Sequence, residues 1–221
     1  MTAGPARDGQ SALAGNGKEL VRERALAGAV QRGLERLYQL DPAEDVAAFV
    51  TPAEGEQREA LLVREGEDGL ELALRLPALA RREFDVAEGA ALDPLCQLIE
   101  GVSHFVYLAD RASHDREATQ LELELQAEVD KYIVLAASIR GLDARKSARL
   151  RARLYVGVSF VHDAASEVGQ RYRLANDLAH KFVRRLERDY VCRGRFRELH
   201  LELRSFYRMG QEAKLRVGRD A

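Results

Sequence analysis

The chain has 221 residues, of which 46% are apolar and 32% are charged, and its formal net charge at pH 7 is −2. This composition excludes a chain that is disordered throughout, a collagen and a disulfide scaffold, and the length suits one large domain or one domain with an appendage. No apolar run reaches the ~18 residues that a membrane-spanning helix needs. The first ten residues contain an acid and precede no apolar segment, so we expect no signal peptide.

Charge is unevenly distributed along the chain. Residues 1–140 carry 15 basic and 26 acidic side chains, whereas residues 141–221 carry 19 basic and 10 acidic ones. This asymmetry has three possible explanations. The two halves neutralise each other within one chain, two copies pair head to tail, or the basic half binds a polyanion. The two cysteines, Cys96 and Cys192, lie far apart in the sequence. We expect both to be reduced and the protein to be cytoplasmic.

The N-terminal third begins with helical patterns. Apolar residues at helical spacing predict an amphipathic helix over 18–39, which ends where Asp41 precedes a proline. With Asp41 as its N-cap and Pro42 in its first turn, a short helix is predicted over 42–50. We expect a loop over 51–57.

Residues 58–76 depart clearly from helical spacing. The leucines at 70, 72, 74 and 76 alternate with other residues, which predicts a strand with one apolar face. A weaker strand pattern precedes it, and the glycines at 66 and 69 suit a tight turn between the two. The segment therefore predicts a β-hairpin, which must lie on helices or pair with another chain because two strands alone are marginally stable in water.

Helical patterns fill the rest of the chain. The segment 117–138 is ambiguous, because its apolar residues also alternate as they would in a strand. Its leucine, glutamate, glutamine and alanine residues favour a helix, and no β-branched residue occurs between 120 and 128. Predicted helices span 93–111, 117–138, 144–160, 162–190 and 195–209.

These patterns predict a mainly α fold, a multi-helix bundle of about six helices with one β-hairpin near residues 58–76. We expect a flexible tail over 1–17, a single helical domain over 18–209 that contains the hairpin, and a basic tail over 210–221.

Familiar catalytic and ligand-binding motifs are absent from the sequence. It contains no Walker-type phosphate loop, no GxGxxG, HExxH, CxxC or GxSxG motif and no EF-hand loop. No motif ties the chain to a known family.

The helix predicted over 93–111 has unusually few charges. Between Asp93 and Asp110 only Glu100 is formally charged, and His104 follows one helical turn later. A helix that is apolar nearly all round is usually enclosed on both sides. Glu100 and His104 would then point into a second, partly buried interface, where they could hydrogen-bond to each other or bind one ion.

The helix predicted over 117–138 places a carboxylate in an apolar stripe. Glu128 falls in the middle of the stripe and Glu124 at its edge. An ionised carboxylate buried without a partner costs several kcal/mol, so we expect an arginine, His104 or a metal beside Glu128. Glu100, His104, Glu124 and Glu128 are therefore the candidate site, with His104 and Glu128 as candidate metal ligands. The favoured interpretation of these buried groups is a structural network in which arginines pair with the carboxylates, and a working site is the alternative.

Three hypotheses of function follow. The favoured one is an interaction or structural protein that self-associates or binds a protein partner. The second is a metal-dependent hydrolase that uses the buried Glu/His residues. The third is nucleic-acid binding through arginines interleaved with aromatics over 145–208, although the acids among them favour a solvated or subunit-contact surface. We expect no membrane partner, and the sequence specifies no cofactor.

Overall fold

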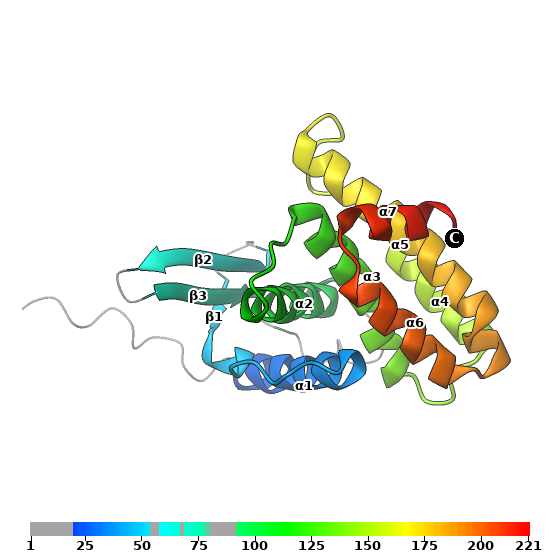
Figure 1. The fold of residues 1–221 in the computed structure, drawn as a ribbon, viewed down its shortest axis with the longest axis horizontal. Helices are drawn as coiled ribbons and strands as arrows, with labels where there is room; N and C mark the ends of the chain where they lie inside the picture. Colours follow the sequence, from blue (N-terminus) through cyan, green and yellow to red (C-terminus); the bar gives the residue numbers. More distant parts are fainter. Residues whose placement is uncertain (1–19, 54–57, 67–68, 78, 80–91) are drawn as a thin grey trace, which may run out of the picture.

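The computed structural model of the chain describes residues 20–53, 58–66, 69–77, 79 and 92–221. Within these residues the fold is mainly α, as predicted, with seven α-helices where about six were expected and a small sheet. Figure 1 shows the sheet on one side of α2 and the helices α3 to α7 on the other side. The helices are α1 (Val21–Tyr38), α2 (Asp93–Ser113), α3 (Gln120–Ser138), α4 (Ala144–Tyr155), α5 (Glu167–Asp189), α6 (Phe196–Arg208) and α7 (Gln211–Arg219). The strands are β1 (Val50–Pro52), β2 (Ala60–Gly66) and β3 (Gly69–Leu76), and short 3-10 helices span Val46–Ala48 and Val191–Arg193.

The predicted hairpin is confirmed. Strands β2 and β3 pair antiparallel with Gly66 opposite Gly69, and the turn residues 67–68 lie outside the described part of the chain. The loop predicted over 51–57 is wrong at Thr51 and Pro52, which belong to β1, and residues 54–57 lie outside the described part of the chain. Strand β1 pairs parallel with β3 and makes a three-stranded sheet of order β1-β3-β2. Leu74 and Leu76 of β3 are fully buried and Leu72 is half-buried, which confirms the apolar face for these three leucines, whereas the side chain of Leu70 lies outside the described part.

The short helix predicted over 42–50 is wrong. Only Val46–Ala48 forms a single 3-10 turn, and its N-cap is Asp45, which accepts a hydrogen bond from the backbone of Ala47, rather than Asp41. The backbone N–H of Val46 donates to Gln31 of α1 at 2.8 Å, and the chain then enters β1. These two tertiary contacts outweigh the weak local preference for a helix.

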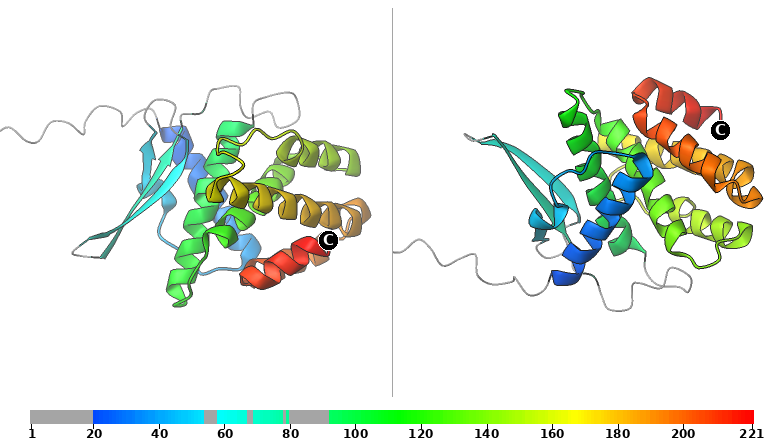
Figure 2. Two further views of the ribbon diagram at one scale, coloured as in Figure 1. Left: turned by 90° about the horizontal axis from the view of Figure 1, so that it is seen from above. Right: turned by 60° about the horizontal axis from the view of Figure 1, so that its bottom comes forward.

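A glycine of α2 lets the sheet lie against the helix. A Cβ atom at Gly101 would stand 2.6 Å from a methyl carbon of Leu74, so only glycine allows β3 to come this close. Figure 2 shows the hairpin extending from this contact away from the helices. Helix α2 thus carries the sheet on one side, and it begins at Asp93-Pro94 as predicted.

The ambiguous segment is a helix, as its residue types indicated. It begins after Thr119, whose hydroxyl accepts from the backbone of Glu122 at 3.2 Å while the Glu122 carboxylate accepts from the backbone of Thr119 at 2.8 Å. Helix α3 packs against α2 and α5, and it also touches α1, α4 and α7. Apolar residues are therefore needed nearly all round it, which explains the strand-like alternation.

Buried polar residues on α3 and its neighbouring helices form a hydrogen-bonded set that we call the Asp130 network. Asp130 accepts hydrogen bonds from the Tyr38 hydroxyl of α1, the Ser103 hydroxyl of α2 at 2.6 Å and the Gln126 amide at 2.9 Å. Gln126 in turn accepts from Lys214 of α7 at 2.8 Å. The network ties α1, α2 and α7 to α3 through bonds that leave Asp130 well satisfied.

The helices of the C-terminal half are shorter than predicted. The segment predicted over 144–160 ends at Tyr155, close to Gly157, whose φ of +75° favours glycine. The segment predicted over 162–190 begins only at Glu167, because Ser166 caps the helix by accepting from the backbone of Gly169 at 3.0 Å. Residues 156–166 are thus a loop, whereas the prediction over 195–209 closely matches α6.

The last residues form a helix, α7, where a basic tail was expected. Lys214 of α7 is fully buried, and its Nζ lies 4.5 Å from the ring centre of Tyr107 and 5.1 Å from that of Phe206. Its hydrocarbon stem fills apolar space while its ammonium group faces the rings and Gln126. A buried lysine is rare, so composition alone indicated an exposed segment.

Both cysteines are free thiols, as expected from their separation in the sequence. Among the described residues, no helix has the length and hydropathy needed to cross a bilayer.

Candidate functional site

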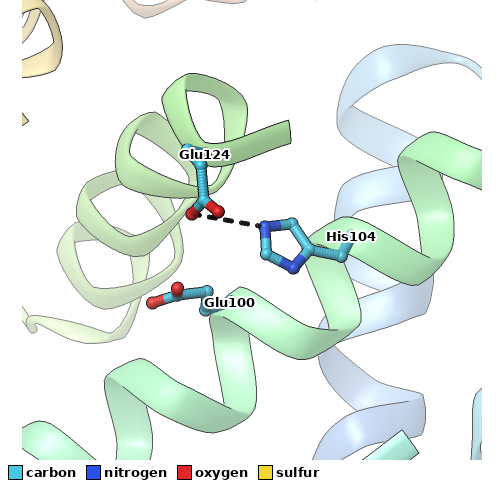
Figure 3. A group of neighbouring side chains, drawn as sticks. All are labelled: Glu100, His104 and Glu124. Carbon is cyan, nitrogen blue, oxygen red and sulfur yellow. Dashed lines mark ion pairs between the residues drawn. The ribbon is translucent and has the colours of Figure 1, made fainter. Parts of the chain in front are cut away.

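The contact between α2 and α3 brings the predicted site residues together. Glu100 and His104 stand one turn apart on α2, and Glu124 and Glu128 stand one turn apart on α3. Figure 3 shows Glu100, His104 and Glu124 in the space between these two helices. One ligand atom from each of these three side chains lies within 4.8 Å of the others. We call Glu59, Glu100, His104, Glu124, Glu128 and Lys131 the Glu–His cluster.

His104 has a buried nitrogen without a hydrogen-bond partner among the described residues. This atom, Nε2, faces Glu124, but the carboxylate oxygen is 3.9 Å away, which is too long for a hydrogen bond. Burial lowers the pKa of the His104 imidazole more than the charge of Glu100 raises it. The ring is therefore neutral near pH 7, and a neutral imidazole is the form that binds metals.

The side chain that pairs with Glu128 in the structure is Lys131, whereas the sequence suggested an arginine, His104 or a metal. The ammonium of Lys131 donates to Glu128 at 2.8 Å and to Glu100 at 3.0 Å. Burial alone would lower the pKa of Lys131, but the two carboxylates raise it well above its usual value. Lys131 thus stays charged and joins α3 to α2. The structure groups His104 with Glu100 and Glu124, so the predicted ligand pair of His104 and Glu128 is not the closest set.

Glu59, which directly precedes β2, is a member of the cluster that sequence reasoning missed. Its backbone N–H donates to Gln97 of α2 at 3.0 Å, and its carboxyl group hydrogen-bonds to Glu100. Burial, together with the charges of Glu100 and Glu124, raises the pKa of Glu59 to about 9. No local pattern marks this residue, because its position depends on how the sheet packs against α2.

The pKa values of the other three carboxyl groups are shifted in different directions. Burial and the charge of Glu100 raise the pKa of Glu124 to about 8, and a hydrogen bond with Tyr172 of α5 opposes part of that rise. Burial also raises the pKa of Glu128. For Glu100, burial raises the pKa, but the charge and hydrogen bond of Lys131, together with His104 and Arg58, lower it below its usual value.

The cluster has four carboxyl groups and one ammonium group of its own, that of Lys131. The guanidinium groups of Arg58 and Arg171, outside the cluster, lower the pKa of Glu100 and Glu124 respectively, yet the pKa values of Glu59 and Glu124 stay raised. Without a further cation, the cluster reduces its negative charge by holding protons near neutral pH. A divalent cation would displace those protons and supply the missing charge.

A cavity of about 680 Å³ adjoins the cluster. Four cluster residues line it (Glu59, Glu100, Glu128 and Lys131), whereas His104 and Glu124 do not. The loop over 156–166 supplies much of the remaining wall through Val158, Ser159, Phe160, Val161 and His162. Tyr172, which also lines the cavity, stacks on the His162 ring at 5.4 Å. A volume of this size accommodates a small organic molecule.

Several arginines considered for nucleic-acid binding are paired with acids of the same half of the chain. An arginine that is paired with an acid is less available to bind a phosphate group. These pairs therefore match a solvated or structural network better than a surface that binds a polyanion. The pairs are Arg151 with Glu187, Arg185 with Glu202, Arg188 with Asp189 at 2.8 Å, and Arg195 with Glu198 at 3.1 Å.

The chain matches no protein-family model, no curated protein and no solved structure. A proposal of function therefore depends on the geometry of the cluster and its cavity.

Proposed function

We propose that the protein is a metal-dependent hydrolase whose divalent ion is bound by Glu100, His104 and Glu124. One observation carries the proposal: a buried imidazole nitrogen without a hydrogen-bond partner among the described residues faces two carboxylates. One neutral imidazole and two carboxylates form a donor set that suits Zn²⁺ and other first-row divalent ions.

The three groups stand close enough together for one ion to be bound after the side chains move slightly toward it. Metal–ligand bonds of ~2.0–2.2 Å place two ligand atoms ~3–4 Å apart. The 3.9 Å between His104 Nε2 and the Glu124 carboxylate lies within that range, and it is too long for the two to satisfy each other directly. Three protein ligands also leave a position open for water or substrate, as in catalytic zinc sites.

Two carboxyl groups beside the ligands support hydrolysis as the reaction. When bound, a divalent ion makes water a better nucleophile and polarises a substrate oxygen. Glu59 and Glu128 line the cavity and lie outside the set of three ligands, and burial raises the pKa of both. A carboxyl group whose pKa is raised toward neutrality can accept or donate a proton during bond cleavage. These residues would move the proton, and the cavity would hold the substrate.

Metal binding is the first test. Chelator-treated protein titrated with Zn²⁺ or Mn²⁺ in a calorimeter is expected to bind one ion per chain. His104→Ala is expected to weaken that binding at least 100-fold. His114→Ala is the matched control, because His114 is exposed and its ring bonds to Asp110, away from the cluster. Wild-type protein that binds neither ion would refute the proposal.

Hydrolysis is the second test. Metal-loaded protein is assayed against a panel of p-nitrophenyl esters that includes an acetate and a phosphate, and chelator is expected to abolish the activity. Glu128→Gln is expected to lower the rate at least tenfold while changing ion affinity by less than threefold, because Glu128 is not a ligand. Rates that are equal with chelator and with metal for every ester would contradict the assignment to hydrolases.

The other two hypotheses from the sequence stay predictions. Self-association is checked by light scattering at two protein concentrations, and a strict monomer would contradict it. Binding to random DNA or RNA at 50 mM salt checks the third hypothesis, in which binding should weaken steeply as salt is added.

A further inference from the structure

Glu100 stands between two groups of cluster residues. On one side, one turn later on α2, is His104, which faces Glu124. On the other side are Glu128 and Lys131 of α3, whose ammonium contacts Glu100. The two helices thus present two successive levels of ligand-type side chains, and Glu100 takes part in both.

The ammonium of Lys131 occupies the second level as a bound cation would. It lies 3.0 Å from a carboxylate oxygen of Glu100 and 2.8 Å from one of Glu128, and only 10% of the side chain is exposed. Glu100, Glu128 and Lys131 all line the cavity. Two carboxylates, with water molecules in the remaining positions, form a ligand set that suits a divalent ion.

We propose that the Glu–His cluster is a two-cation centre in which Lys131 fills the second position, so that a chain lacking this lysine binds one more divalent ion. The first position is the one assigned under the proposed function, and the inference about the second position deepens that proposal. An ammonium cannot share the space between Glu100 and Glu128 with a divalent ion, because the two positive charges would repel each other at that distance.

Lys131 would then do for the substrate what a second metal ion does in two-metal hydrolases. The ammonium has three N–H groups, and among the described residues it donates two hydrogen bonds, to Glu100 and Glu128. Lys131 also lines the cavity, so its third N–H can bind a substrate oxygen beside the first ion. A fixed charge of this kind stabilises negative charge that develops on that oxygen.

The test compares the number of Zn²⁺ ions bound by the full chain and its variants, measured by equilibrium dialysis and elemental analysis. Lys131→Met is expected to bind one ion more than wild type. Lys131→Arg, which keeps the charge, is expected to bind the wild-type number. The double variant Lys131→Met with Glu128→Gln is expected to lose the extra ion, because one ligand of the second position is gone.

The outcomes separate this inference from the proposed function. If wild type binds no ion, the proposed function fails, whereas the inference depends on the difference between Lys131→Met and wild type. Equal stoichiometry in folded Lys131→Met and wild type would overturn the inference, and so would an extra ion that persists in the double variant. If Lys131→Met is unstable without metal, excess Zn²⁺ is expected to raise its melting temperature by more than that of wild type, and an equal or smaller rise would also overturn it.

Discussion

The Nε2 atom of His104 lies 3.9 Å from a carboxylate oxygen of Glu124, and neither group satisfies the other. The two residues lie on neighbouring helices, α2 and α3. Most buried polar atoms in proteins have partners, so this buried nitrogen is the observation on which the proposed metal site depends. We predict the effects of changes at this pair, at the residues around it and at the helices that hold it in place.

We predict that the affinity for Zn²⁺ rises with pH up to about pH 8. Glu124 has a pKa of about 8, so below that pH an ion must displace its proton. One displaced proton gives a change of about tenfold per pH unit. Competition with a chelator of known affinity at pH 6.5, 7.5 and 8.5 measures the slope. An affinity that is equal at pH 6.5 and 7.5 would contradict the role of Glu124 as a ligand.

We predict that Glu59→Gln stabilises the metal-free protein at alkaline pH. The pKa of Glu59 is raised to about 9 from an ordinary value of 4.5, so between these pH values the folded state holds one proton more than the unfolded state. Stability therefore falls as pH rises through this window, by up to about 1.4 kcal/mol per pH unit for one such group. Glutamine cannot ionise and avoids the loss.

Urea unfolding in the presence of a chelator at pH 5 and 8.5 tests the effect of Glu59→Gln. The variant is expected to be similar to wild type at pH 5 and more stable by at least ~1 kcal/mol at pH 8.5. A difference between the two proteins that does not depend on pH would show that Glu59 is not held in its protonated form.

We predict the opposite pH dependence for Lys214. Burial lowers the pKa of Lys214 to about 7, although Asp130 and Glu122 raise it, and Arg111 lowers it further. Between about pH 7 and 10 the unfolded state thus binds one proton more, so the lysine makes the protein more stable as pH rises. The stability of wild type relative to Lys214→Met is expected to increase from pH 7 to pH 9.5. Unfolding curves at these two pH values measure it, and a constant difference would be the contrary result.

We predict that Gly101→Ala destabilises the protein by about 1–3 kcal/mol. The added Cβ would stand 2.6 Å from a methyl carbon of Leu74, so β3 would have to move away from α2. Gly33→Ala in α1 is the matched control, because nothing lies within 4 Å of its Cβ position. Because Gly33 lies inside a helix, Gly33→Ala is expected to stabilise the protein by about 0.5–1 kcal/mol. Thermal unfolding compares the two, and equal effects would show that the close contact of sheet and helix costs nothing to disturb.

The sequence predicted the parts of the fold that depend on local patterns. The alternating leucines of β3 and the spacing of α2 and α6 are local signals, and residue types correctly favoured a helix for α3. Strand β1 has three residues and exists because β3 offers it a partner, so nothing in its own sequence indicated it. The buried position of Lys214 in α7 likewise depends on a pocket formed by rings from other helices.

The part of the candidate site that depends on helical spacing was predictable from the sequence, and the part that depends on how the sheet packs was not. Helical spacing placed Glu100 with His104 and Glu124 with Glu128, and the expectation that Glu128 needs a partner is met by Lys131 three residues later. Lys131 could have been predicted as this partner, because residues three apart share a helix face. The position of Glu59 could not have been predicted, because a residue before a strand reaches the cluster only through the packing of the sheet.

Helix α3 carries buried polar groups on two of its sides, the Glu–His cluster through Glu124, Glu128 and Lys131 and the Asp130 network through Gln126 and Asp130. Apolar contacts need no particular partner atom, so they select the register of a helix less strictly than hydrogen bonds between buried groups do. A rotation of α3 by one residue would strip both polar groups of their partners at once, and each unpaired group costs about 1–3 kcal/mol. The register of this helix is thus specified by its hydrogen bonds, and the apolar residues around it supply stability without choosing the alignment.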